Sequence, residues 1–245
     1  MKGLCQRAFV VVALCLFVGT SARAEWRRMT DVNYNTAYTL EEEGLEIGLL
    51  SPLTVGVTDE LQVAIHPVLL LLSQPNIAIR WRVTQEATTT LALNLAASWS
   101  FIRKVDAEDR STAAEGVATG FPGTLQLTAV TSIRLGENWL LSGSTGPAVD
   151  FLSDRAIRAL ATVHAGIHWL INEDQLLMLQ GQTSIQLTDG LQTRRTSGEL
   201  VYAVGLSRIT HLAIGVGVGR FVFETSDSQR DVLNVFPVVD LWFRL

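Results

Sequence analysis

The side chains of this sequence best suited to acid–base or metal chemistry are four histidines, His66, His164, His168 and His211. An imidazole titrates near neutral pH and is a common metal ligand. His164 and His168 lie four residues apart in a run of alternating apolar and polar residues, a pattern that predicts a β-strand. At about 3.3 Å per residue their side chains stand about 13 Å apart, too far to share a metal ion. We therefore expect no metal site and no bound cofactor.

A serine near His164 offers a second kind of chemistry, nucleophilic catalysis. If the strand that holds His164 pairs with the next one across a turn at 172–174, Gln182 lies opposite His164 and Ser184 lies diagonally from it. A Ser–His pair is the core of a membrane-embedded lipid hydrolase. However, we expect no carboxylate beside the imidazole, and the chain lacks a Gly-x-Ser-x-Gly motif. We expect no catalytic residues, and the polar set His164, His168, Gln182 and Ser184 is interpreted as hydrogen-bonding.

Arginines form a third group with chemical potential. Alternation along the predicted strands puts Arg82, Arg134 and Arg244 on the polar face at one depth, with Arg80 slightly further from the turns. Asp240 lies one step above Arg244 and is the obvious nearby acid. Guanidinium groups gathered at one depth of a narrow passage favour anions. The sequence thus predicts a basic constriction, and the alternative is that these charges pair and fill the interior.

The element that must position these groups is the β-strand, because apolar and polar residues alternate through most of the chain. The longest run covers residues 156–171, well beyond the roughly 5–6 residues of an ordinary soluble strand. A tilted membrane-spanning strand needs about 9–11 residues. In mid-strand the polar positions are small and uncharged, as is typical of a barrel lumen. A secreted soluble β-sandwich is the disfavoured alternative.

Composition and the N-terminus narrow the class of protein. The chain has 245 residues, 48% hydrophobic and 18% charged, which excludes a disordered chain. Residues 1–24 predict a cleaved signal peptide, with a basic start, an apolar run and a small-residue site at Ala22-Arg23-Ala24. It contains both cysteines, Cys5 and Cys15, so the mature chain is expected to lack disulfides and thiol chemistry. The net charge of −5 argues against a nucleic-acid partner.

Short and long connections alternate between the predicted strands, the pattern of an all-β, up-and-down antiparallel transmembrane barrel. Residues 25–34 are expected to form a short periplasmic segment and residues 35–245 the barrel. Asn35–Leu40 is the first predicted strand, which brings the count to about twelve; ten is possible if 60–66 and 76–83 do not span. The other predicted strands cover 44–57, 60–66, 76–83, 88–101, 121–135, 138–146, 156–171, 175–187, 198–207, 211–223 and 232–245.

Aromatic residues test this orientation. Trp81, Trp139, Trp169 and Phe243 fall on the apolar face, each beside a short connection. Aromatic side chains gather where a membrane barrel meets the interface. These four residues predict a periplasmic girdle.

The ending of the chain, Val238-Val239-Asp240-Leu241-Trp242-Phe243-Arg244-Leu245, resembles that of small bacterial outer-membrane β-barrel proteins. The stretch Thr36–Leu40, followed by Pro52, Thr58-Asp59 and His66-Pro67, is similar to members of this class without an assigned function. The resemblance implies a place in the cell outer membrane, contact with its lipid, and recognition of the last strand by the barrel assembly machinery. The class includes pores, enzymes, adhesins and structural anchors, so it does not give the function.

We expect a narrow passive channel for small solutes with a weak anion preference, since twelve strands lie between filled eight-stranded barrels and wide pores. The residues favour a non-enzymatic role. Two alternatives remain open, a membrane-embedded lipid hydrolase using His164 and Ser184, and a structural or adhesive barrel with a closed lumen. The apolar segment 67–72 is unusual for an outside loop and suits a lid or a contact with a hydrophobic ligand.

Overall fold

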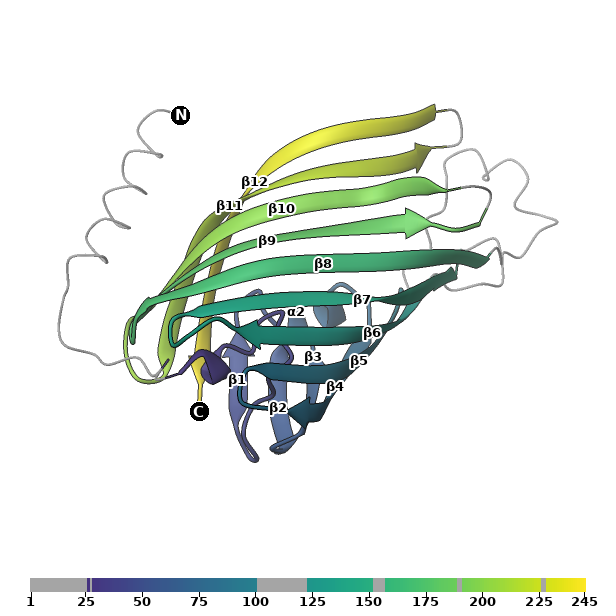
Figure 1. Ribbon diagram of the computed structural model, residues 1–245. Helices are drawn as coiled ribbons and strands as arrows, with labels where there is room; N and C mark the ends of the chain where they lie inside the picture. Colours follow the sequence, from purple (N-terminus) through teal and green to yellow (C-terminus); the bar gives the residue numbers. More distant parts are fainter. Residues whose placement is uncertain (1–25, 27, 101–122, 152–156, 189–190, 226–227) are drawn as a thin grey trace, which may run out of the picture.

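The computed structural model describes residues 26, 28–100, 123–151, 157–188, 191–225 and 228–245. Each strand pairs in antiparallel fashion with its neighbours in the chain, and the last strand pairs with the first, which closes a barrel (Figure 1). The expected fold class, an antiparallel barrel of about twelve strands, is confirmed. Within the part of the chain that the structure describes, no helix is both long enough and apolar enough to cross a membrane.

Strand lengths differ strongly around the barrel, from four residues in β1 to 17 in β12. Two short helices, η1 (Met29–Asp31) and α2 (Pro67–Leu71), accompany the strands. The strands are β1 (Leu45–Gly48), β2 (Leu53–Thr58), β3 (Leu61–Ile65), β4 (Asn76–Gln85), β5 (Thr89–Trp99), β6 (Gly123–Arg134), β7 (Trp139–Phe151), β8 (Ile157–Asn172), β9 (Gln175–Gln186), β10 (Gln192–Gly205), β11 (Thr210–Thr225) and β12 (Ser228–Arg244).

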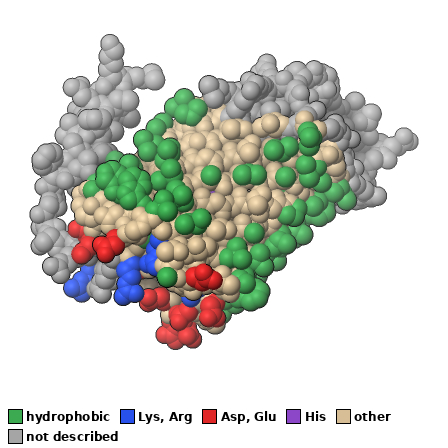
Figure 2. Space-filling model, viewed as in Figure 1, with side chains coloured by type: hydrophobic (Ala, Val, Ile, Leu, Met, Phe, Trp, Pro, Cys, Tyr) green, Lys and Arg blue, Asp and Glu red, His purple; other side chains and the backbone are tan. Residues whose placement is uncertain are grey.

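Side-chain alternation separates an outer from an inner face. On β8, Val163 and Ile167 are exposed on the outside, whereas Leu160 and His168 are buried inside. The outer face is rich in exposed aliphatic residues, as a surface in contact with lipid requires. On the face shown in Figure 2, the charged side chains gather at the end where β1 and the C-terminus lie, and hydrophobic side chains are spread over the rest.

The predicted strand 44–57 is wrong as a single element, because the chain turns back at residues 49–52 and forms β1 and β2 instead. Asp240 on β12 stabilises this turn: its carboxylate accepts hydrogen bonds from the Leu50 backbone and from the Ser51 hydroxyl. Pro52, which cannot donate a ladder hydrogen bond, follows directly. The split supplies the twelfth strand.

The predicted first strand, Asn35–Leu40, is also wrong. Residues 26 and 28–44, called the plug below, form no strand, and Thr36, Ala37 and Tyr38 in this segment are almost completely buried inside the barrel, whereas Glu41–Glu43 are exposed. Within the expected periplasmic segment 25–34, Trp26, Met29 and Val32 are buried against the inner wall of the barrel. The reason is physical: the polar groups of this stretch bind side chains of the inner wall rather than a neighbouring strand.

Several expected loops are shorter than predicted because the strands continue. β7 runs through Pro147 to Phe151, and β10 begins at Gln192. The short connections expected at 58–60, 84–87, 136–138, 172–174 and 208–210 all lie at one end of the barrel. We call it the short-turn end, and it is where the plug lies. The predicted signal peptide 1–24 falls outside the described residues.

Candidate functional site in the barrel lumen

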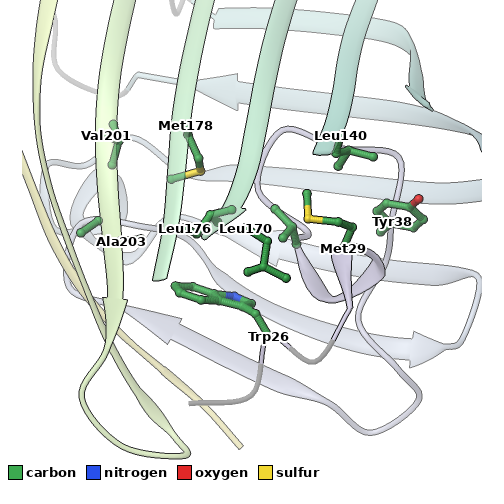
Figure 3. Close-up of a cluster of buried hydrophobic side chains, with 11 residues drawn as sticks. Trp26, Met29, Tyr38, Leu140, Leu170, Leu176, Met178, Val201 and Ala203 are labelled. Carbon is green, nitrogen blue, oxygen red and sulfur yellow. The ribbon is translucent and has the colours of Figure 1, made fainter. Parts of the chain in front are cut away.

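Apolar packing holds the plug against the inner wall at the short-turn end (Figure 3). The Trp26 ring lies 5.0 Å from the ring of His211, which stacks on Trp242 at 5.2 Å. The Trp26 backbone N–H also donates to the Glu173 carbonyl in the β8–β9 turn, at 3.3 Å. The buried cluster contains Trp26, Met29, Val32 and Tyr38 from the plug, and Leu140, Leu170, Leu176, Met178, Val201, Ala203 and Ala213 from the strands.

Polar side chains of three strands bind the plug backbone. The Arg80 guanidinium on β4 donates to the carbonyls of Asn33 and Tyr38, at 2.8 and 3.2 Å. The Ser132 hydroxyl on β6 accepts a hydrogen bond from the Ala37 N–H at 2.8 Å. The Leu40 N–H donates in the same way to Gln62 on β3. These contacts satisfy backbone groups that are buried away from any sheet.

One glycine permits the closest approach of plug and wall. The Gly56 carbonyl on β2 accepts from the Glu43 N–H at 3.0 Å, and the Gly56 N–H donates to the Gly44 carbonyl at 2.8 Å. A Cβ atom on Gly56 would lie 1.9 Å from the Glu41 carbonyl oxygen. Only glycine fits at this position, and it allows the plug backbone to pack directly against the backbone of β2.

Arg244 on β12 anchors the plug from the opposite side. Its guanidinium forms an ion pair with Glu46 at 2.9 Å and donates to the Asp31 carbonyl at 3.0 Å and to Asn33 Oδ1 at 3.2 Å. The expectation that Asp240 is the nearby acid of Arg244 is therefore wrong, because Asp240 binds the β1–β2 turn.

The other predicted constriction residues are spread out. The Arg134 guanidinium donates to the Ala87 carbonyl in the β4–β5 turn, and Arg82 is half-buried beside that turn. Among Arg80, Arg82, Arg134 and Arg244, only Arg80 lines either of the two lumen cavities described next. The structure thus ties two of these arginines to the plug rather than gathering all four in an open ring.

Two cavities lie in the lumen, with volumes of about 320 and 390 Å³. Both are bordered by Asn35 of the plug, by His164 on β8 and by Gln182 on β9. The side chains around them are mostly polar and uncharged. The first is lined also by Arg80, Asn94, Gln126, Thr128, Ser144, Thr162 and Ser184, the second by Tyr34, Gln180, Ser197, Glu199 and Phe236.

Gln180 joins the polar groups of the two cavities, and sequence reasoning missed it. Its side-chain carbonyl accepts from the Asn35 amide at 2.9 Å and from His164 Nε2 at 3.3 Å. Its amide donates to the Glu199 carboxylate. The one signal for it is its even position on β9, which places it on the inner face beside Gln182.

His164 and Ser184, the histidine–serine pair of the hydrolase alternative, come from adjacent strands. His164 pairs with Gln182 across β8–β9, in the register expected, and Ser184 pairs with Thr162. Ser184 and His164 line the same cavity, but no hydrogen bond between them occurs among the described side chains. Gln180 lies between His164 and Glu199, so the carboxylate does not orient the imidazole directly.

The remaining histidines have structural surroundings. His168 and His211 are 0% and 1% exposed and lie among the apolar residues that hold the plug. His66 precedes α2, and its backbone N–H donates to the Asn76 side chain. Across the described ranges, no group of three histidine, cysteine or acidic side chains is arranged to hold a metal ion.

The four predicted girdle residues lie on the outer face near the short-turn end. Trp139 stacks on Trp169 with ring centres 5.3 Å apart and planes at 2°. Trp81 and Phe243 are exposed in the same way on β4 and β12. Their position is the one a membrane interface would occupy.

Two ionisable groups of the plug have shifted pKa values. Burial raises the pKa of Tyr34 to about 12, and the nearby Glu199 carboxylate adds to this rise. Burial also raises the pKa of Asp31 above its ordinary value, although its hydrogen bond from the Arg28 N–H opposes the rise. The Tyr34 side chain borders the second cavity.

Comparison with known proteins gives little beyond the fold. No protein-family model matches the chain, and no curated protein matches it. Among solved structures it is similar to the "Outer-membrane expressed OmpT of Vibrio cholerae", with a TM-score of 0.48 and 10% sequence identity. The match covers 79% of this chain and 64% of that one. The closed antiparallel barrel is established by the strand pairing of this chain itself, and its activity must be argued from the lumen.

Proposed function

We propose that this barrel lies in the outer membrane and is a narrow passive channel for small polar solutes, restricted at its short-turn end by the plug. The observation that carries the proposal is the pair of polar cavities in the lumen, both bordered by plug residue Asn35. Linings that are mostly polar and uncharged offer hydrogen bonds to a passing solute without holding it tightly.

The plug supports a restricted rather than a wide path. It adds no strand to the barrel, and it is held by wall side chains such as Arg80, Ser132 and Arg244, together with backbone hydrogen bonds at Glu173 and Gly56. Individual hydrogen bonds of this kind contribute about 0.5–1.5 kcal/mol each, more when one partner is charged. Such a segment can leave the lumen without breaking any strand pair except the contact at Gly56.

A weak anion preference is part of the proposal and rests on Arg80. Its guanidinium is the positive group on the lining of the first cavity, and Glu199 is the negative group on the lining of the second. Gln180 donates a hydrogen bond to the Glu199 carboxylate, whereas the hydrogen bonds of the Arg80 guanidinium to the plug go to the neutral carbonyls of Asn33 and Tyr38. The balance favours anions slightly.

Conductance of the purified full chain in a planar bilayer tests the function. We expect small openings with a chloride preference, and larger openings when Arg244→Gln removes the ion pair with Glu46 and weakens the plug. The absence of conductance from both proteins would contradict the channel and favour a closed structural barrel. Cell fractionation tests the location: the protein should be recovered from outer membranes as a heat-modifiable band, not as a soluble periplasmic protein.

A further inference from the structure

On one side of the barrel the wall is formed by the short strands β1–β3, which stand next to the long strand β12. β12 has 17 residues, but its only pairs with β1 are Arg244, Phe243 and Trp242. One more backbone hydrogen bond joins the Leu49 N–H to the Leu241 carbonyl. In the described residues no strand lies beside β12 from 228 to 240 on this side, and Figure 1 shows β12 extending far beyond the short strands β1–β3.

Pro237 marks this edge independently. The Arg244 N–H donates to the Ile209 carbonyl, so the N–H groups of even-numbered β12 residues face β11. Odd-numbered residues therefore direct theirs toward the side of β1–β3. Pro237 has no N–H to direct there, and proline inside a strand is confined to unpaired edges or bulges.

The other border of the opening is formed by β4 and α2. β3 pairs with β4 only from Leu61 to Ala64, after which the chain leaves the sheet and forms α2. β4 extends two residues, Ile77 and Asn76, beyond its last pair with β3, and both residues pair with β5. The gap between β12 and β4 is thus bounded below by the β1–β2 turn and by α2.

The opening lies at the depth of the lipid hydrocarbon. Val235 precedes the girdle residue Phe243 by eight positions on β12. That is about 26 Å along the strand, or about 19 Å in height at the roughly 45° tilt of membrane strands. A hydrocarbon layer is about 30 Å thick, so this edge of β12 faces acyl chains.

The rim of the opening is apolar, while the space behind it is polar. Leu71 and Leu72 of α2 are 86% and 56% exposed, and Val235 on β12 is 69% exposed. Leu49 and Leu50 of the β1–β2 turn are exposed as well. Behind the rim, the 390 Å³ cavity reaches Phe236 on β12, the strand that borders the gap.

Gly217 on β11 makes room for Phe236 beside the cavity. Phe236 lies against β11 opposite Gly217, where a Cβ atom would come within 2.3 Å of the Phe236 ring. The absence of a side chain at Gly217 makes room for the Phe236 ring. The cavity behind it then presents Ser197, Glu199 and Gln180 to whatever enters from the side.

We propose that this lateral opening binds an amphiphilic lipid of the surrounding bilayer, with its polar head group in the 390 Å³ cavity and its acyl chain over α2 and the β12 edge. An amphiphile satisfies both surfaces, since polar groups at this depth need hydrogen bonds and the leucines need an apolar partner. A second copy inserted in the same direction offers β12 a parallel strand, not the antiparallel one that continues this sheet. The inference goes beyond the proposed function, because conduction along the axis does not require it.

Fluorescence quenching by nitroxide lipids tests the site. Cys5→Ser and Cys15→Ser leave an added cysteine as the only thiol. A bimane label is attached to Ser197→Cys in the cavity or to the adjacent Thr196→Cys on the outer face, a matched control at the same depth. Each protein is placed in phosphatidylcholine vesicles that carry the nitroxide on the head group or on the mid-chain.

We expect the head-group nitroxide to quench the Ser197 label at least about two-fold more than the Thr196 label, because a bound head group is drawn into the cavity. The mid-chain nitroxide should quench the Thr196 label more than the Ser197 label. Absence of head-group quenching at Ser197 overturns the proposal, including the case in which another protein segment covers the gap. Quenching in a barrel that conducts nothing supports the lateral site and contradicts only the channel.

A rim variant tests the route. Replacing Leu71 and Leu72 together by asparagine should lower the Ser197 quenching by about half, because the acyl chain loses its apolar contact. Leu179→Asn on the outer face of β9 is the control and should leave it unchanged. Unaltered quenching in the double variant overturns the assigned route, and heat modifiability confirms that each variant is folded.

Discussion

Replacing Trp26 by alanine tests whether the plug closes the short-turn end. Trp26 is 2% exposed and packs on His211 and Trp242. Truncation of a buried tryptophan to alanine costs about 3–5 kcal/mol. Trp26 belongs to no strand, so the cost falls on plug docking rather than on the ladder of the barrel. The docking equilibrium should shift by about 10²- to 10⁴-fold toward the released plug.

Two measurements on the Trp26→Ala protein check this reasoning. Amide hydrogen exchange of residues 29–40 should accelerate, and conductance in planar bilayers should rise. Trp139→Ala is the matched control, since Trp139 stacks on Trp169 at the outer face and touches no plug residue among the described contacts. Faster hydrogen exchange with unchanged conductance would contradict the claim that the docked plug restricts conduction at the short-turn end. Unchanged exchange would refute the docking energy assigned to Trp26.

Other substitutions examine the wall and the lumen. Val163→Arg on the lipid face should lower the free energy of unfolding in urea by about 2–4 kcal/mol, and Thr162→Arg facing the cavity by much less; equal losses would contradict the assigned faces. Arg80→Gln should reduce the chloride preference seen in the reversal potential, and an unchanged value would separate selectivity from Arg80. His164→Ala should leave any phospholipid hydrolysis unchanged; loss of a measurable activity would replace the channel with the hydrolase. Because burial raises the pKa of Asp31, docking should tighten as the pH falls from neutrality toward 3.8, so conductance should drop, and Asp31→Asn should abolish this dependence.

The sequence predicts the barrel well because period-two alternation is a local signal. On β8 it separates Val163 and Ile167, which face outward, from His164 and His168, which face inward. The turn at 172–174 then determines the pairing of His164 with Gln182. Strand ends were harder to predict. The predicted strand 138–146 stops before Pro147, yet β7 continues through this proline to Phe151.

The plug could not be predicted, because nothing local distinguishes it from a strand. Thr36–Leu40 alternates polar and apolar residues, but Ala37 and Thr36 are both buried inside the barrel. Its partners lie far away in the chain, such as Ser132, 95 residues from Ala37, and Arg244, 213 residues from Asp31. Such contacts depend on the closed barrel and leave no pattern in a short window.

In the lumen, too, the direction in which a side chain points could be predicted from the sequence, whereas its hydrogen-bond partners could not. Alternation places Arg80 and Arg244 inward but cannot reveal that backbone carbonyls of the plug accept their hydrogen bonds. Gln180 escaped notice because an inward glutamine is ordinary in a lumen, and its importance comes from Asn35 and Glu199 on either side. The turn between β1 and β2 did carry a local signal, in Ser51-Pro52.

The position of the plug inside the ring constrains the order of folding. The ring closes through three residue pairs between β1 and β12, and the last of these strands also carries Trp242 and Arg244, which bind the start of the plug. A ring closed beforehand would have to be threaded by its own N-terminus. A sheet that curls around the N-terminal segment avoids threading. The plug, which is synthesised first, then serves as the surface on which the sheet closes, and its contacts with Trp242 and Arg244 form only when β12 is in place.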